Sequence, residues 1–144
     1  MTIYVPGLRE LPRDQMAELD GAAEFSVRHT GGKLSAYVYE WEDLRIVIDV
    51  MPDADRAGHL KQFERWIEVR SASLGQVVEP GLVDRIRSST IVLGIVVEKT
   101  TDRDVWHDRV QDIVGMICFN TKSLLFWEGM VYNENCRRVW PAGK

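Results

Sequence analysis

Apolar and polar residues alternate through much of the first half of the chain. In the segment 33–41, aromatic residues occupy every second position from Tyr37 to Trp41, which is typical of a strand with one buried face. The segments 23–29 and 44–51 alternate in the same way, and short turn sequences separate the three segments. We therefore predict three antiparallel strands that follow one another along the chain.

The spacing of the apolar residues then changes from two to about 3.6. Leu60, Phe63 and Ile67 recur at intervals of three and four residues, which predicts an amphipathic helix from about residue 53 to residue 73. The same kind of spacing predicts a second long helix from about residue 102 to residue 119. Both helices carry charged residues opposite the apolar stripe, so each is expected to pack on a sheet through one face.

Two shorter patterns lie between these helices. The segment 82–89 is amphipathic and predicts a short helix, whereas the segment 91–98 is apolar at nearly every position. A run of this kind indicates a central strand that is covered on both faces. Gly94 in the middle of the run indicates close packing against a neighbour.

The two ends of the chain complete the predicted order of elements. We interpret residues 1–22 as an N-terminal arm with a short helix, which begins at Pro12 and extends to about Leu19, because proline suits the first turn of a helix. At the other end, the segments 123–127 and 129–140 predict further strands, the second with a turn at an Asn-Glu-Asn sequence.

Together these elements predict an α+β fold. A mostly antiparallel sheet, with the element order β-β-β-α-α-β-α-β-β, packs against two main amphipathic helices. The chain has 144 residues, of which 45% are hydrophobic and 28% are charged. This length and composition are typical of one globular domain, so we expect residues 1–144 to form a single domain.

Charge and composition also limit the classes of partner. The net charge is −4, whereas nucleic-acid-binding proteins usually gather Lys and Arg on one face, so we expect no nucleic-acid partner. No apolar run approaches the roughly 20 residues of a membrane-spanning helix, so we expect no membrane partner. Cys118 and Cys136 lack the spacing of a zinc or redox motif. These features favour a cytoplasmic protein with reduced thiols.

The motifs of common enzyme mechanisms are absent from the sequence. The chain contains no glycine-rich phosphate-binding motif, no HExxH and no GxSxG. We therefore expect no cofactor, and we favour a non-enzymatic role.

One cluster of polar residues is nevertheless compatible with catalysis. On a helix that begins near Asp53, Asp55 and His59 lie four positions apart and face the same way, so together with Asp49 they could bind a metal ion. Glu64 would then act as the base of a small metal-assisted hydrolase. The alternative is structural, because aspartates at a helix start cap free N–H groups and suit the positive end of the helix dipole. We favour the structural interpretation.

Tryptophan is frequent in this sequence, with five in the chain. On the first long helix, His59, Gln62, Trp66 and Val69 form a second line beside the main apolar stripe, again at intervals of three and four residues. A face this wide is either deeply buried or packs on both the sheet and a partner chain. Our leading hypothesis is a non-enzymatic protein-interaction or regulatory module, a homo-oligomer or a binder of a protein partner, that uses this surface.

The aromatic row on the strand at 33–41 leaves a similar choice. Tyr37, Tyr39 and Trp41 either pack against a helix in the core or line a pocket. We favour core packing, because aromatic residues at strand spacing are usually buried.

Overall fold

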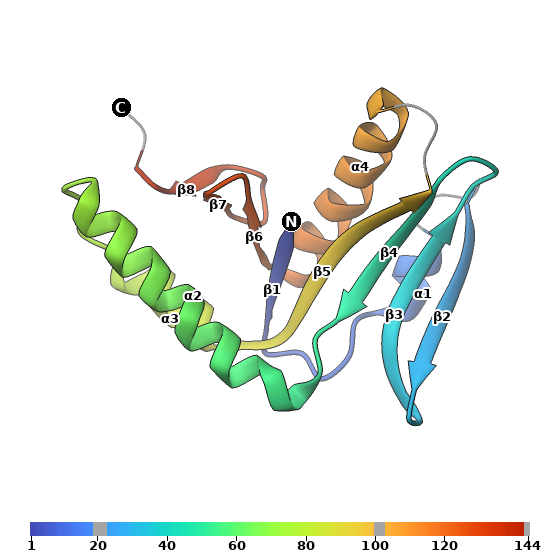
Figure 1. Ribbon diagram of the computed structural model, residues 1–144, viewed down its shortest axis with the longest axis horizontal. Helices are drawn as coiled ribbons and strands as arrows, with labels where there is room; N and C mark the ends of the chain where they lie inside the picture. The colour runs from blue at the N-terminus through green and yellow to red at the C-terminus, as the bar shows by residue number, and fades with distance from the viewer. Residues whose placement is uncertain (19–22, 100–102, 143–144) are drawn as a thin grey trace.

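The structure is a computed structural model that describes residues 1–18, 23–99 and 103–142. Within these ranges the chain forms one sheet of eight strands and four helices (Figure 1). The strands are β1 (Thr2–Pro6), β2 (Glu24–Thr30), β3 (Lys33–Glu40), β4 (Arg45–Val50), β5 (Ser89–Lys99), β6 (Leu124–Trp127), β7 (Met130–Tyr132) and β8 (Arg138–Trp140). The helices are α1 (Arg13–Ala17), α2 (Asp53–Ser73), α3 (Pro80–Arg87) and α4 (Arg103–Thr121).

The predicted α+β class is confirmed. The strands lie in the order β2-β3-β4-β5-β1-β6-β7-β8, and every neighbouring pair is antiparallel. The predicted three-strand meander is β2 to β4, the first long helix is α2, and the short amphipathic segment is α3. The second long helix is α4, although its predicted start near residue 102 lies outside the described residues.

The structure corrects the prediction of an N-terminal arm. Thr2–Pro6 forms β1, which lies between β5 and β6, and Ile3 and Val5 are fully buried. This strand has five residues and ends at a proline, so its alternation is too short to stand out in the sequence. The short helix near Pro12 is confirmed as α1, whereas its predicted end near Leu19 lies outside the described residues.

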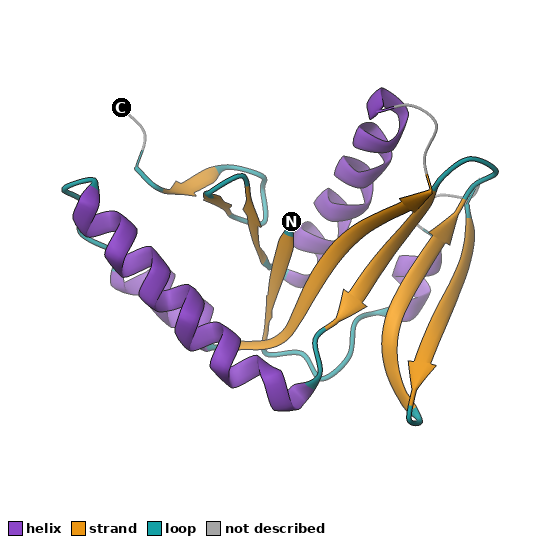
Figure 2. Cartoon of the chain, viewed as in Figure 1, coloured by secondary structure: helices purple, strands orange, loops and turns teal. Residues whose placement is uncertain are grey.

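Helices cover both faces of the sheet (Figure 2). We call the side that packs against α4 and α1 the α4 face; its core includes Ile48 and Leu93 from the sheet and Ile113 from α4. We call the other side the α2 face, where α2 and α3 pack on residues such as Tyr4 and Leu124.

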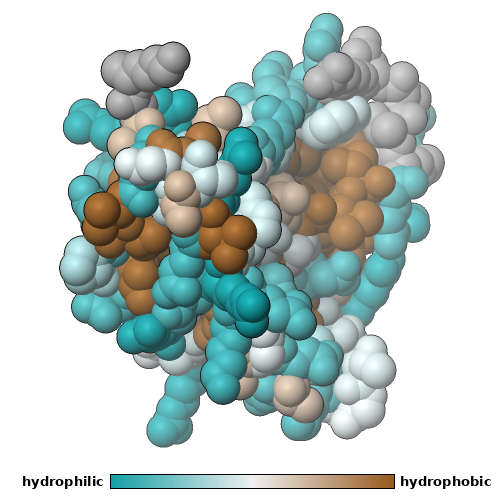
Figure 3. Space-filling model, turned by 60° about the vertical axis from the view of Figure 1, so that its left-hand side comes forward, coloured by the Kyte–Doolittle hydropathy of each residue, from teal (hydrophilic) through white to brown (hydrophobic). Residues whose placement is uncertain are grey.

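On the α2 face the helices leave part of the sheet uncovered. Over β3 and β4, the side chains of Ala36, Val38 and Val47 form a small separate cluster that contains no helix residue, although each of them is at most 4% exposed, and Val96 of β5 is 43% exposed. On the side that Figure 3 turns forward, hydrophobic residues are visible in a hollow beside hydrophilic ones. The predicted close packing at Gly94 is wrong, because a Cβ added there would meet nothing within 4 Å.

Candidate functional site

The catalytic candidates that we predicted from the sequence lie at or near the start of α2. Pro52 precedes the helix, and no side chain makes a capping hydrogen bond there. Asp53 instead accepts a hydrogen bond from Arg56 at 2.8 Å, while Asp53 and Asp55 both lie in the first turn. Their charges therefore suit the helix dipole, but the predicted hydrogen-bonded cap is not formed.

His59 is tied to the centre of the sheet. The hydroxyl of Tyr4 lies 2.8 Å from Nε2 of His59, and the two rings stack with their centroids 5.7 Å apart. Burial lowers the pKa of His59 and raises the pKa of Tyr4. Both shifts favour the neutral forms, which share a hydrogen bond between the Tyr4 hydroxyl and Nε2 whose donor depends on the tautomer of His59.

The three metal candidates line one cavity. Asp49, Asp55 and His59 surround a space of about 430 Å³ between the sheet and the start of α2. Asp49 lies two positions after Val47 on β4, so both side chains are on the α2 face. Within the described ranges, no group of three or more His, Cys, Asp or Glu side chains is arranged to hold a metal ion.

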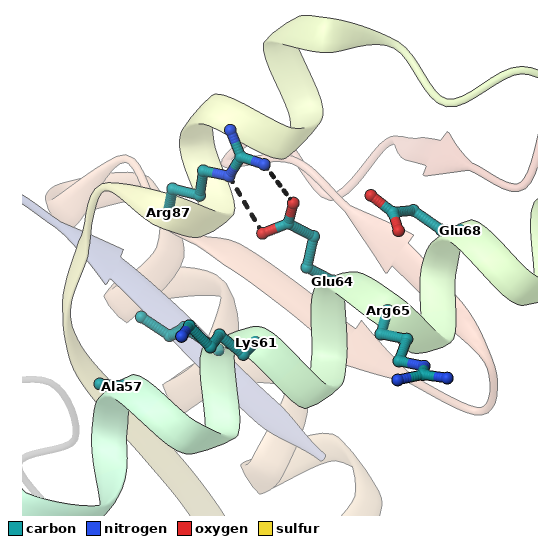
Figure 4. Close-up of a pocket in the computed structure, with 7 residues that line it drawn as sticks. Ala57, Lys61, Glu64, Arg65, Glu68 and Arg87 are labelled. Atoms are coloured by element: carbon teal, nitrogen blue, oxygen red, sulfur yellow. Dashed lines mark hydrogen bonds and ion pairs between the residues drawn. The ribbon is translucent and has the colours of Figure 1, made fainter.

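Glu64, the candidate base, lies on the other side of α2. It accepts two hydrogen bonds from the guanidinium of Arg87, at 3.1 and 2.5 Å, in the groove between α2 and α3 (Figure 4). These hydrogen bonds lower the pKa of the Glu64 carboxyl. A carboxylate held this way is a weak base, and it does not line the cavity that Asp49 and His59 share.

The second line of residues on α2 is exposed to different degrees. We call His59, Gln62, Trp66 and Val69 together the α2 flank. Trp66 is 41% exposed and Val69 is 62% exposed, while Gln62 is exposed and His59 is half-buried. The flank is therefore not part of the sealed core.

Aromatic side chains of the sheet pack against the inner side of Trp66. Its ring centroid lies 5.3 Å from that of Phe126 and 5.3 Å from that of Trp140, with both contacts edge to face. Phe63 stacks on Tyr4 at 4.5 Å, and Nε1 of Trp140 donates a hydrogen bond to Oγ of Ser71 at 2.8 Å. These contacts fix the layer, so the exposed face of Trp66 is presented on a rigid base.

The sequence predicted the α2 flank but not its support. Phe126 and Trp140 belong to strands more than fifty residues away in the chain, and no local spacing connects them with α2. Their apolar character in short strands was the only signal, and it does not specify which helix they contact.

Comparisons with known proteins add no information about this site. The chain matches no protein-family model, no curated protein and no solved structure. Across the described residues, the search for a helix with the length and apolar character needed to cross a bilayer finds none.

Proposed function

We propose that this protein is a non-enzymatic protein-interaction module that self-associates through the α2 flank. The observation that carries the proposal is the exposed face of Trp66 on its fixed aromatic layer. Tryptophan is enriched among the residues that dominate binding energy, because a large rigid side chain buries much area with little loss of conformational entropy. Val69 and Gln62 extend this surface along the helix.

The charges at the two ends of the flank support a second copy of the chain as the partner. Asp55 and Arg70 are both exposed, and neither side chain makes an ion pair within the described residues. Two copies of α2 placed antiparallel around Gln62 bring each Asp55 close to the partner copy's Arg70. A two-fold axis requires a self-complementary surface of this kind.

Light scattering over a range of protein concentrations tests the proposal. We expect a dimer that Trp66→Glu converts to a monomer, with the dissociation constant raised at least about thirtyfold, because the new carboxylate would be buried without a partner. Ala57→Glu is the matched control. It introduces the same charge change on the opposite side of the same helix, and it should leave the dimer intact.

A second substitution guards against loss of folding in Trp66→Glu. Val69 is 62% exposed, so Val69→Glu should weaken the dimer while leaving the unfolding midpoint almost unchanged. A protein that is monomeric at every concentration contradicts the proposal. A dimer that survives both substitutions also contradicts it, and would direct attention to the free edge of the sheet at β2.

A small metal-assisted hydrolase is the second candidate, supported by the cavity that Asp49, Asp55 and His59 share. Thermal unfolding with Mg²⁺, Mn²⁺ or Zn²⁺, compared with EDTA, tests it, because a ligand that binds the native state raises the midpoint. A metal-specific rise that is lost in Asp49→Asn and His59→Ala would favour the hydrolase. The absence of any rise would count against it.

A further inference from the structure

The core on the α4 face is open at one end. There the loop after β1, the turn between β2 and β3 and the first residues of α2 surround a cavity of about 850 Å³. The apolar side chains of Leu34, Val50 and Ile91 line it, and they belong to the buried core or pack against it. Its volume lies within the roughly 300–1,000 Å³ of small-molecule sites, which are likewise largely apolar with a few polar groups.

Tyr37 contributes a buried polar side chain to the wall of this cavity. Its side chain is only 3% exposed, yet its hydroxyl makes no hydrogen bond within the described residues. The hydroxyl oxygen is not fully enclosed by protein atoms, in contrast to Nε1 of Trp41, which is sealed and has no partner among the described residues. The Tyr37 hydroxyl is therefore accessible from the cavity that Tyr37 lines. Its neighbour Tyr39 is 1% exposed and donates a hydrogen bond to the carbonyl of Met16 at 2.7 Å.

The contrast between the two tyrosines shows that the hydroxyl of Tyr37 is free to bond a molecule inside the cavity. It differs in this from sealed hydroxyl groups, which almost always have a hydrogen-bond partner within the protein. Burial and the carboxylate of Glu10 raise the pKa of Tyr37, against a smaller opposite effect of Arg13, so the phenol keeps its proton and is available as a donor.

The charged groups around the cavity favour an anion. Arg9 and Lys33 line it and make no ion pair within the described residues, and Glu10 is the opposing carboxylate. The remaining two charges, on Arg56 and Asp53, pair with each other at 2.8 Å. The two unpaired cations therefore outnumber the one unpaired carboxylate.

We propose that this cavity binds a small organic anion with an apolar body, such as an aromatic or branched carboxylate. The hydroxyl of Tyr37 donates a hydrogen bond to the anionic group, Arg9 and Lys33 supply positive charge, and the apolar walls contact the body. The site lies apart from the α2 flank and does not depend on the proposed self-association.

Benzoate, followed by amide chemical shifts of the isotope-labelled protein, is the probe that tests this site. We expect saturable shifts at Leu34 and Val50 with a dissociation constant of about 1 mM or tighter. Benzamide has the same shape without the charge and should bind at least about fivefold more weakly, because it loses the attraction of the cations.

Tyr37→Phe is the decisive variant because it removes only the hydroxyl. It should weaken benzoate binding about tenfold, since a hydrogen bond to a charged group is lost, and the unfolding midpoint should not fall. Lys33→Gln should weaken binding less, and Lys61→Gln on α2 is the matched control that should have no effect.

Three outcomes would overturn the site. The first is the absence of saturable shifts at these residues. The second is equal binding by the Tyr37→Phe variant and the unsubstituted protein. The third is a set of shifts confined to the α2 flank, which would place benzoate on Trp66 instead.

Discussion

The two faces of the sheet differ in how completely helices cover them. On the α4 face, Ile48 and Leu93 are fully buried. On the α2 face the sheet is as deeply buried at Val92, but Val96 is 43% exposed and Trp66 of the covering helix is 41% exposed. Of the 21 residues of α2, all of which are described, three are buried, namely Phe63, Ile67 and Ser71. A helix of this length that buries so little has surface left for a partner, while the α4 face contributes most of the stable core.

The largest expected effect tests this division of roles within one strand. Leu93→Ala removes a fully buried side chain of β5 from the α4 face and should lower the free energy of unfolding by about 3 kcal/mol. Val96→Ala, three residues along the same strand but on the α2 face, should cost less than about 1 kcal/mol. Urea unfolding measures both values, and equal losses would show that the exposed position at Val96 contributes as much as the buried one at Leu93.

Local patterns were sufficient to predict most of the fold. The spacing of Leu60, Phe63 and Ile67 defined α2, and alternation around Tyr37 defined β3, because each signal lies within one element. The position of β1 could not be predicted in this way. Its place between β5 and β6 depends on pairing with strands about 90 and 120 residues away, which no local spacing encodes.

The candidate site, like the fold, could be predicted where its residues lie within one element, and could not be predicted where they come from distant strands. The sequence identified the α2 flank, including Trp66, from helical spacing alone. It did not identify Tyr4, Phe126 or Trp140, which support that flank, because contacts between strand and helix depend on the sheet order. The sequence left open whether the aromatic row of β3 packs in the core or lines a pocket. Tyr39 packs in the core near α1, whereas Tyr37 both packs in the core and lines a cavity.

A smaller effect should distinguish the buried and exposed sides of α2 itself. Ser71→Ala removes the acceptor for the indole N–H of Trp140 and leaves that buried donor unpaired, which should cost about 1–2 kcal/mol. Ser73→Ala is the matched control, because Ser73 is exposed and, among the described residues, its hydroxyl donates a hydrogen bond to the carbonyl of Arg70 alone. Thermal unfolding compares the two variants. Equal midpoints would mean that the contact does not secure β8 to α2.

The smallest expected effect is a pH dependence at the point where α2 meets β1. Because burial lowers the pKa of His59 in the folded protein, the unfolded chain binds more protons than the folded protein just below pH 6.5, roughly the ordinary value for histidine. This contribution to stability is therefore complete above that pH and is lost as the pH falls toward the folded-state pKa. His59→Gln removes the titrating group and keeps an acceptor for Tyr4, so the unfolding free energy should decline less steeply with falling pH.

His29→Gln is the control for this slope, because His29 is exposed at the end of β2. Urea unfolding at a series of pH values should give the same slope for this variant and for the unsubstituted protein. If His59→Gln also retained that slope, the protonation of some other group would have to account for it. The protonation of His59 would then not be what weakens the contact between α2 and β1 as the pH falls. Self-association through Trp66 should then have the same pH dependence in His59→Gln as in the unsubstituted protein.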